Sequence, residues 1–157
     1  MNTLYRQLAL AVALGVSAMT AQAEVVEIDA AELARLTAKG IPLIDIRTES
    51  EWKSSGVIAG SQLLTFFDEH GRADPAQWLA AARPIAGPEQ PLILICRSGK
   101  RTRVAAQFLS EQAGYKKVYH VSGGIGGWVG LGRPLTRREI GRARVGKECR
   151  SRWSPYH

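Results

Sequence analysis

The chain contains few of the residues from which disulfide frameworks and metal sites are built. Its 157 residues include only two cysteines, Cys96 and Cys149, and three histidines. Two cysteines do not make a disulfide framework. The sequence has no C-x-x-C motif and no pair of histidines at ligand spacing, so it does not predict a zinc site. We therefore expect a protein without a bound metal or other cofactor.

The chain also lacks an apolar run long enough to cross a membrane. Its longest run, Leu8–Met19, has about a dozen residues, whereas a spanning helix needs about 20. The run follows a single positive charge, Arg6, and precedes an Ala-Gln-Ala cleavage pattern at residues 21–23. This order predicts a secretory signal peptide over residues 1–23, with a membrane anchor as the alternative. We expect an exported, periplasmic protein that has no membrane span once the signal is removed.

An excess of positive charge is confined to the C-terminal end. The formal net charge of the chain is +7, but residues 24–135 carry 13 basic and 12 acidic side chains. Residues 136–157 carry seven Lys or Arg and two Glu. A near-neutral body predicts no nucleic-acid partner. The basic tail would suit an anionic surface, but we expect a solvated and poorly ordered extension.

Strand-like and helical patterns alternate along the body of the chain. The strand-like segments are Val25–Ile28, Ile41–Ile46, Leu63–Phe67, Leu92–Cys96 and Lys117–Val121. Helical patterns begin after Asp29, at Thr48, at Pro75 and at Thr102, the last with Val104, Ala105, Phe108 and Leu109 facing inward. The alternation predicts one α/β domain over residues 24–135, with a mostly parallel central sheet and helices on both faces.

One of these strands ends on Cys96, directly before a cationic segment and a helix. A thiol in this position lies where ligands bind in open α/β sheets. The amide groups of the helix start and the cations Arg97, Lys100 and Arg101 all favour thiolate over thiol. The same groups would bind a small oxyanion. The sequence therefore predicts an anion-binding cysteine nucleophile, with a buried structural cysteine as the alternative.

Four sequence blocks occur in a characteristic order. They are Leu43–Arg47 with Glu51-Trp52, Gly56–Ser61, Cys96–Arg101, and Gly123-Gly124-Ile125 with Trp128 and Gly132–Leu135. In these blocks the chain resembles the single-domain rhodanese-like sulfurtransferases, including the exported bacterial members. The likeness runs from about Val25 to Leu135. It departs from the family pattern at Val57 and Ala59, where the family usually has His and Pro at structural turn positions.

The resemblance implies a thiosulfate sulfurtransferase that works without a cofactor. Cys96 would carry a persulfide between thiosulfate and an acceptor such as cyanide or a thiol, in a double displacement. The loop Arg97–Thr102, which includes Ser98 and Gly99, would bind the donor. In the family, charged residues at the positions of Lys100 and Arg101 favour thiosulfate over mercaptopyruvate.

Four further residues are expected near this loop. Arg47 is a candidate for the mouth of the site and substrate binding, although a structural role is also open for it. Asp45, Gly123 and Gly124 are expected to be structural, the glycines through tight turning or close backbone approach. No heptad or long apolar edge is present, so we expect a monomer.

Other functions remain open at this point. A cysteine phosphatase or arsenate reductase usually has arginine six residues after the cysteine, where this chain has Thr102. A non-catalytic binding or sulfur-carrier module is a second alternative. Cys149 could act as a resolving thiol. His70 and His120 have no partner nearby in the sequence, so we expect surface or packing roles and no Cys–His pair.

Overall fold

The sheet at the centre of the molecule has five strands, all paired in parallel. The computed structural model describes residues 23–137. In chain order the strands are β1 (Glu24–Ile28), β2 (Leu43–Asp45), β3 (Gln62–Leu63), β4 (Leu92–Ile95) and β5 (Lys117–Val121). They lie in the order β1-β5-β4-β2-β3, so β4 lies in the middle. All four residues of β4 are buried, as expected for a strand covered on both faces.

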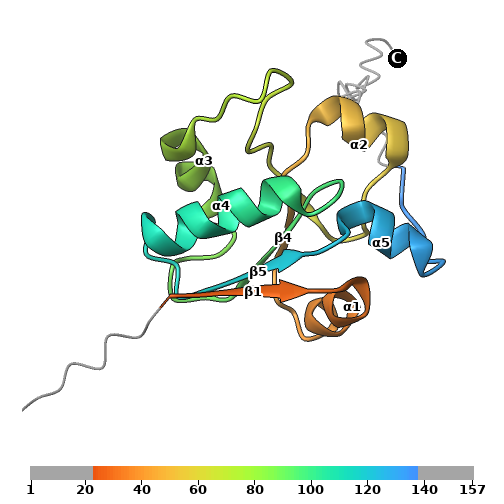
Figure 1. Ribbon diagram of the computed structural model, residues 1–157, viewed down its shortest axis with the longest axis horizontal. Coiled ribbons are helices and arrows are strands. Elements are labelled where there is room, and N and C mark those ends of the chain that lie inside the picture. Colours follow the sequence, from red (N-terminus) through yellow and green to blue (C-terminus); the bar gives the residue numbers. More distant parts are fainter. Residues whose placement is uncertain (1–22, 138–157) are drawn as a thin grey trace, which may run out of the picture.

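Helices cover both faces of the sheet (Figure 1). They are α1 (Ala30–Ala38), α2 (Glu49–Ser55), α3 (Pro75–Ala82), α4 (Lys100–Glu111) and α5 (Gly124–Gly130). Local signals start most of them. Asp29 and Asp74 cap α1 and α3 by accepting from the amides three residues on, and Thr48 and Glu51 form a reciprocal capping box on α2.

Two hydrophobic clusters fill the two sides of the sheet. On one side, α3 and α4 pack against the sheet in a cluster that includes Ile44 and Leu94 of the sheet and Trp78 of α3. On the other side, α1 and α5 pack against the sheet in a cluster that includes Ile93 of β4 and Trp128 of α5. Alternate residues of β4 therefore contribute to opposite clusters, as the period of two in a strand requires. This packing fixes the carboxyl end of β4, from which the next segment of the chain leaves.

The predicted fold class is confirmed, whereas some details of the helices and strands are wrong. The strand expected at Leu63–Phe67 has only two residues, in β3. Helix α4 begins at Lys100, two residues before the predicted start. Val104 of α4 is 55% exposed and so is not an inward residue, whereas Ala105 and Leu109 are buried as predicted and Phe108 is partly buried against the same cluster.

Three predictions fall on parts of the chain outside the described residues. These are the signal peptide over residues 1–23, apart from Ala23, the basic tail beyond residue 137, and the role of Cys149. Within residues 23–137, no helix is both long and apolar enough to cross a membrane.

Candidate active site

The Cys96 thiol lies at the inner end of a short loop between β4 and α4. Cys96 directly follows β4 and is only 1% exposed. The Gly99 amide donates to its Sγ at 3.2 Å, and the Thr102 hydroxyl lies 3.8 Å from the same sulfur. Gly99 precedes α4 with a φ of +89°, a left-handed conformation that turns the chain back over the thiol. The loop thus directs backbone and hydroxyl groups of α4's first turn towards the sulfur.

Helix α5 holds this loop from the other side. The amide of Ile125 donates to the Cys96 carbonyl at 2.9 Å, and that of Gly126 to the Arg97 carbonyl at 3.4 Å. Gly124 has a φ of +53°, and a Cβ added there would lie 2.2 Å from the Cys96 carbonyl oxygen. Only glycine allows this approach. Gly123, with a φ of +73°, makes the turn from β5 into α5.

The three cations of the loop have different surroundings. Arg101 forms two hydrogen bonds to Glu51 of α2, at 2.8 and 2.7 Å. Its guanidinium lowers the pKa of Glu51 from 4.5 to about 2, while the carboxylate raises the pKa of Arg101. Arg97 and Lys100 are exposed and take part in no ion pair among residues 23–137. Arg97 and Lys100 thus keep their full charge for an anion, whereas Arg101, whose guanidinium also interacts with the Cys96 sulfur, is paired with Glu51.

Arg47 and Asp45 form a buried pair beneath the site. They are 2% and 0% exposed, and Nη2 of Arg47 lies 2.7 Å from Oδ2 of Asp45. Arg47 Nε also donates to Asp45, and its two terminal nitrogens donate to the Ser55 hydroxyl and the Gly56 carbonyl. These bonds tie the end of α2 to the end of β2. Arg47 borders the site, but its donors are mostly used within the protein, which favours a structural role over substrate binding.

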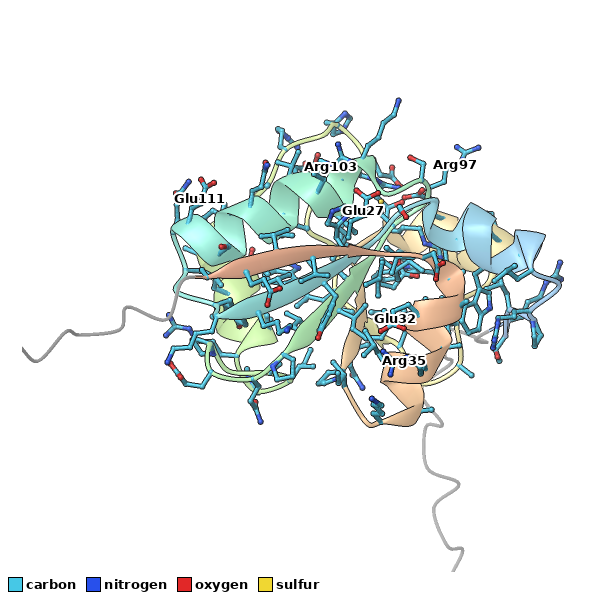
Figure 2. The ribbon with its side chains drawn as sticks, turned by 60° about the horizontal axis from the view of Figure 1, so that its bottom comes forward. Glu27, Glu32, Arg35, Arg97, Arg103 and Glu111 are labelled. Carbon is cyan, nitrogen blue, oxygen red and sulfur yellow. The ribbon has the colours of Figure 1, made fainter. Side chains whose placement is uncertain are left out.

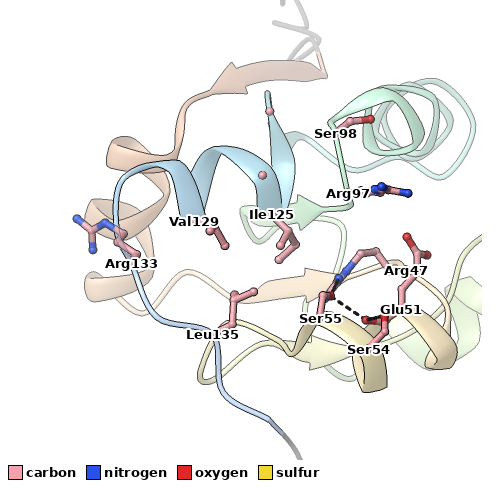
Figure 3. Close-up of a pocket in the computed structure, with 12 residues that line it drawn as sticks. Arg47, Glu51, Ser54, Ser55, Arg97, Ser98, Ile125, Val129, Arg133 and Leu135 are labelled. Carbon is pink, nitrogen blue, oxygen red and sulfur yellow. Dashed lines mark hydrogen bonds between the residues drawn. The ribbon is translucent and has the colours of Figure 1, made fainter.

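A cleft of about 900 Å³ opens beside the loop, between α2 and α5 (Figure 3). Arg97 and Ser98 of the loop line it. The opposite wall is apolar and consists of Ile125, Val129 and Leu135. Arg133 stacks on the Trp128 ring, 4.9 Å from its centroid, at the end of this wall. The cleft is far larger than a single small anion requires.

The structure brings most of the predicted site residues together. The loop Cys96–Thr102 and the two glycines of α5 form one continuous site, with Asp45 and Arg47 below it. Sequence reasoning missed Glu51 as the partner of Arg101, the apolar wall of the cleft and the buried position of His120. A carboxylate at the third position of α2 was visible, but nothing in the sequence showed which cation it meets.

No metal site is formed by the residues that the structure describes. Across residues 23–137, no three His, Cys, Asp or Glu side chains are grouped to hold an ion.

Comparison with known proteins identifies the family. A family model described as "Rhodanese-like domain" matches residues 29–131. Thiosulfate sulfurtransferase 18 of Arabidopsis thaliana is 28% identical over 127 residues, which are 79% of this chain and 93% of the relative. Thiosulfate sulfurtransferase GlpE of Actinobacillus pleuropneumoniae is 49% identical over 47 residues, which are 30% of this chain and 43% of the relative.

A solved structure agrees with these matches. The rhodanese-related protein of Thermoplasma volcanium superimposes with a TM-score of 0.54 and 28% identity, covering 71% of this chain and 97% of its own. The matched residues 29–131 contain the whole Cys96 loop and both helices that hold it. The chain belongs to the family of proteins with a rhodanese-like domain.

Proposed function

We propose that the protein is a thiosulfate sulfurtransferase that carries a sulfane sulfur as a persulfide on Cys96. One observation carries this proposal: Sγ of Cys96 accepts the Gly99 amide at 3.2 Å, at the start of a helix and in a loop that carries the exposed cations Arg97 and Lys100. Such surroundings stabilise negative charge on sulfur, both in the thiolate and in the persulfide. Relatives that bear the name thiosulfate sulfurtransferase support the same activity.

The first half-reaction transfers sulfur from the donor to the enzyme. The Cys96 thiolate attacks the outer sulfur of thiosulfate, a new S–S bond forms, and the bond between the two thiosulfate sulfurs breaks. Its electron pair leaves with sulfite. Arg97 and Lys100 bind the oxygens of the dianion and of the departing sulfite, since both side chains are exposed at the loop. The Cys96 residue is 1% exposed, so the side chains over the loop must move to admit the donor.

The second half-reaction returns the enzyme to its starting state. A nucleophilic acceptor, cyanide or a thiolate, attacks the outer persulfide sulfur, and the S–S bond breaks with its electron pair returning to Cys96. The 900 Å³ cleft provides room for an acceptor larger than cyanide. Its apolar wall with Arg97 and Arg133 at its margins suits a thiol that has both apolar and carboxylate groups.

The geometry disfavours the phosphatase and arsenate reductase alternatives. The position six residues after Cys96 is Thr102, whose hydroxyl donates to the Gly99 carbonyl at 2.9 Å. Arg101, one residue earlier, is held by Glu51. No arginine is therefore placed to wrap a tetrahedral oxyanion from the end of the loop, as those enzymes require.

The mass of the intact protein tests the proposal. Reduced protein treated with thiosulfate is expected to gain one sulfur atom and to lose it on addition of cyanide, with thiocyanate released. Cys96→Ser should show no gain and keep the wild-type circular dichroism spectrum. If the sulfur were gained equally by Cys96→Ser, or not gained by the reduced wild type, the proposed mechanism would be wrong. The second result would favour a non-catalytic binding module.

A further inference from the structure

His120 is a buried histidine with one ring nitrogen that lacks a partner. It lies on β5 and is 4% exposed. Its Nε2 lies 3.6 Å from Oε2 of Glu27, whereas Nδ1 has no hydrogen-bond partner among the described residues. A buried polar atom without a partner is costly, and it marks a place where water, an ion or a ligand belongs. Nδ1 of His120 is such an atom.

The His120 side chain lines a cavity of about 330 Å³ behind the Cys96 loop. Lys100 and Arg103 of α4 line the same cavity, together with Ser98, Gly99 and the turn Ser122-Gly123. Ser98 and Gly123 also line the large cleft, so the loop and the turn separate the two spaces. The cavity is thus next to the Cys96 site but opens on the other side of its loop.

The charges around this cavity favour an anion. Lys100 and Arg103 contribute two cations, and the cavity borders the first turn of the 12-residue helix α4, which has no side-chain cap. Glu27 of β1 is the one acidic group that the structure places against His120, and Arg103 pairs with it at 2.9 Å (Figure 2). The side chain of Arg103 in this ion pair is more than half exposed, so it can also reach a ligand in the cavity.

From this arrangement we infer a second anion site, in which a small dianionic oxyanion binds between Lys100 and Arg103, beside a protonated His120. Ser98 lines the same cavity and its hydroxyl can add a donor, whereas the Ser122 hydroxyl already donates to the Ile28 carbonyl. Lys100 is shared with the donor site of the proposed function, whereas Arg103 and His120 are not part of that site. The second anion site lies outside the large cleft that we assign to the acceptor.

Binding at this site requires a proton. Burial lowers the pKa of His120 below its ordinary 6.5. The charge of Glu27 acts in the opposite direction, and the charge of Arg103 lowers the pKa further. The neutral ring brings no charge to the cavity, whereas the imidazolium brings a third positive charge beside the bound anion. The affinity for the anion therefore rises as the pH falls through the pKa of His120, and a bound anion raises that pKa.

Nuclear magnetic resonance of the protein labelled with ¹⁵N-histidine measures this coupling. Sulfate is the probe, because it remains a dianion throughout the titration, and chloride at equal ionic strength is the control. Saturating sulfate is expected to raise the pKa of His120 by about one unit over chloride, which corresponds to tenfold tighter binding by the protonated form.

Two variants locate the bound anion. Arg103→Gln removes a cation of the proposed site and should reduce the rise in the His120 pKa. Arg97 does not line this cavity, so Arg97→Gln should leave the rise unchanged. Equal titration of His120 in sulfate and chloride would overturn the inference. So would a rise that persists in Arg103→Gln and disappears in Arg97→Gln, since the anion would then lie in the large cleft. The readout does not depend on turnover, so it is independent of whether the protein transfers sulfur.

Discussion

Substitution of Gly124 by alanine tests how closely helix α5 must approach the Cys96 loop. The new methyl group would lie 2.2 Å from the Cys96 carbonyl oxygen and 2.7 Å from that of Arg97. Contacts below 3.0 Å are essentially never tolerated, so α5 and the loop must separate by nearly 1 Å. The bond from the Ile125 amide to the Cys96 carbonyl, now 2.9 Å, would be lost in that movement.

The cost of this change has three parts. An alanine at a φ of +53° is strained by about 1–2 kcal/mol. A lost backbone hydrogen bond adds about 1 kcal/mol, and forced movement of packed segments adds about 1–3 kcal/mol. The free energy of unfolding should therefore fall by about 4 kcal/mol, a large part of the 5–15 kcal/mol typical of a domain. Because the loop positions the nucleophile, displacement by about 1 Å should also reduce kcat/KM about 100-fold.

Two other glycines of the same segment supply matched controls. Gly123 has a φ of +73° but its added Cβ would meet nothing closer than 3.5 Å, so Gly123→Ala should cost only the strain, about 1–2 kcal/mol. Gly130 has no positive φ and open space around its Cβ, so Gly130→Ala should be neutral or slightly stabilising. Urea unfolding and thiocyanate formation from thiosulfate and cyanide measure the series. A Gly124→Ala protein as stable and active as Gly130→Ala would refute the reasoning.

Three further predictions follow from the ion pairs and the exposed cations. Asp45→Ala leaves a buried guanidinium without its carboxylate and should lower the free energy of unfolding by about 3–5 kcal/mol, with a smaller loss for Asp45→Asn, both read by urea unfolding. Glu51→Gln should destabilise the protein by about 1 kcal/mol at pH 7, since solvent screening reduces the effect of a partly exposed pair. Because pairing with Arg101 lowers the pKa of Glu51 from 4.5 to about 2, this contribution is present above pH 4.5 and is lost as the pH falls towards 2, so the two unfolding curves should converge there. Lys100→Ala should raise the KM for thiosulfate about tenfold with unchanged thermal stability, whereas the exposed Lys39→Ala should change neither; an unchanged KM would remove Lys100 from donor binding.

Local and periodic features could be predicted from the sequence. The alternation of apolar runs and capped helices was sufficient for the parallel sheet, because each strand and each cap is encoded within a few residues. The position of Cys96 was predictable for the same reason, since β4 is continuous and apolar and the residues after it are not. Gly124 also carried a local signal, although its contact with the Cys96 carbonyl depends on how α5 folds back.

Contacts between distant segments could not be predicted. Glu51 and Arg101 are 50 positions apart, and their meeting depends on how α2 and α4 pack around the end of the sheet. His120 was expected on the surface or in packing, yet Nδ1 is buried without a partner because β1 and β4 flank it on both sides. Val104 was placed inward by its apolar character, but the buried face of α4 consists of Thr102, Ala105, Ala106 and Leu109, and Val104 lies outside that face.

The pairing of Arg101 with Glu51 changes how the charge of the loop should be understood. Three cations at the start of a helix oppose its dipole, and the sequence alone suggests that all three serve an anion. In the structure Glu51 neutralises one of them, and the capping box on α2 holds that carboxylate in place. Under the proposed function, Arg97 and Lys100 would distinguish a dianionic from a less charged sulfur donor, while Arg101 also links α2 to α4 through Glu51. If Arg101 itself bound the sulfur donor, Glu51→Gln would release its charge and lower the KM for thiosulfate. Because Glu51 holds Arg101 in the structure, we expect the KM to stay within about twofold of the wild-type value.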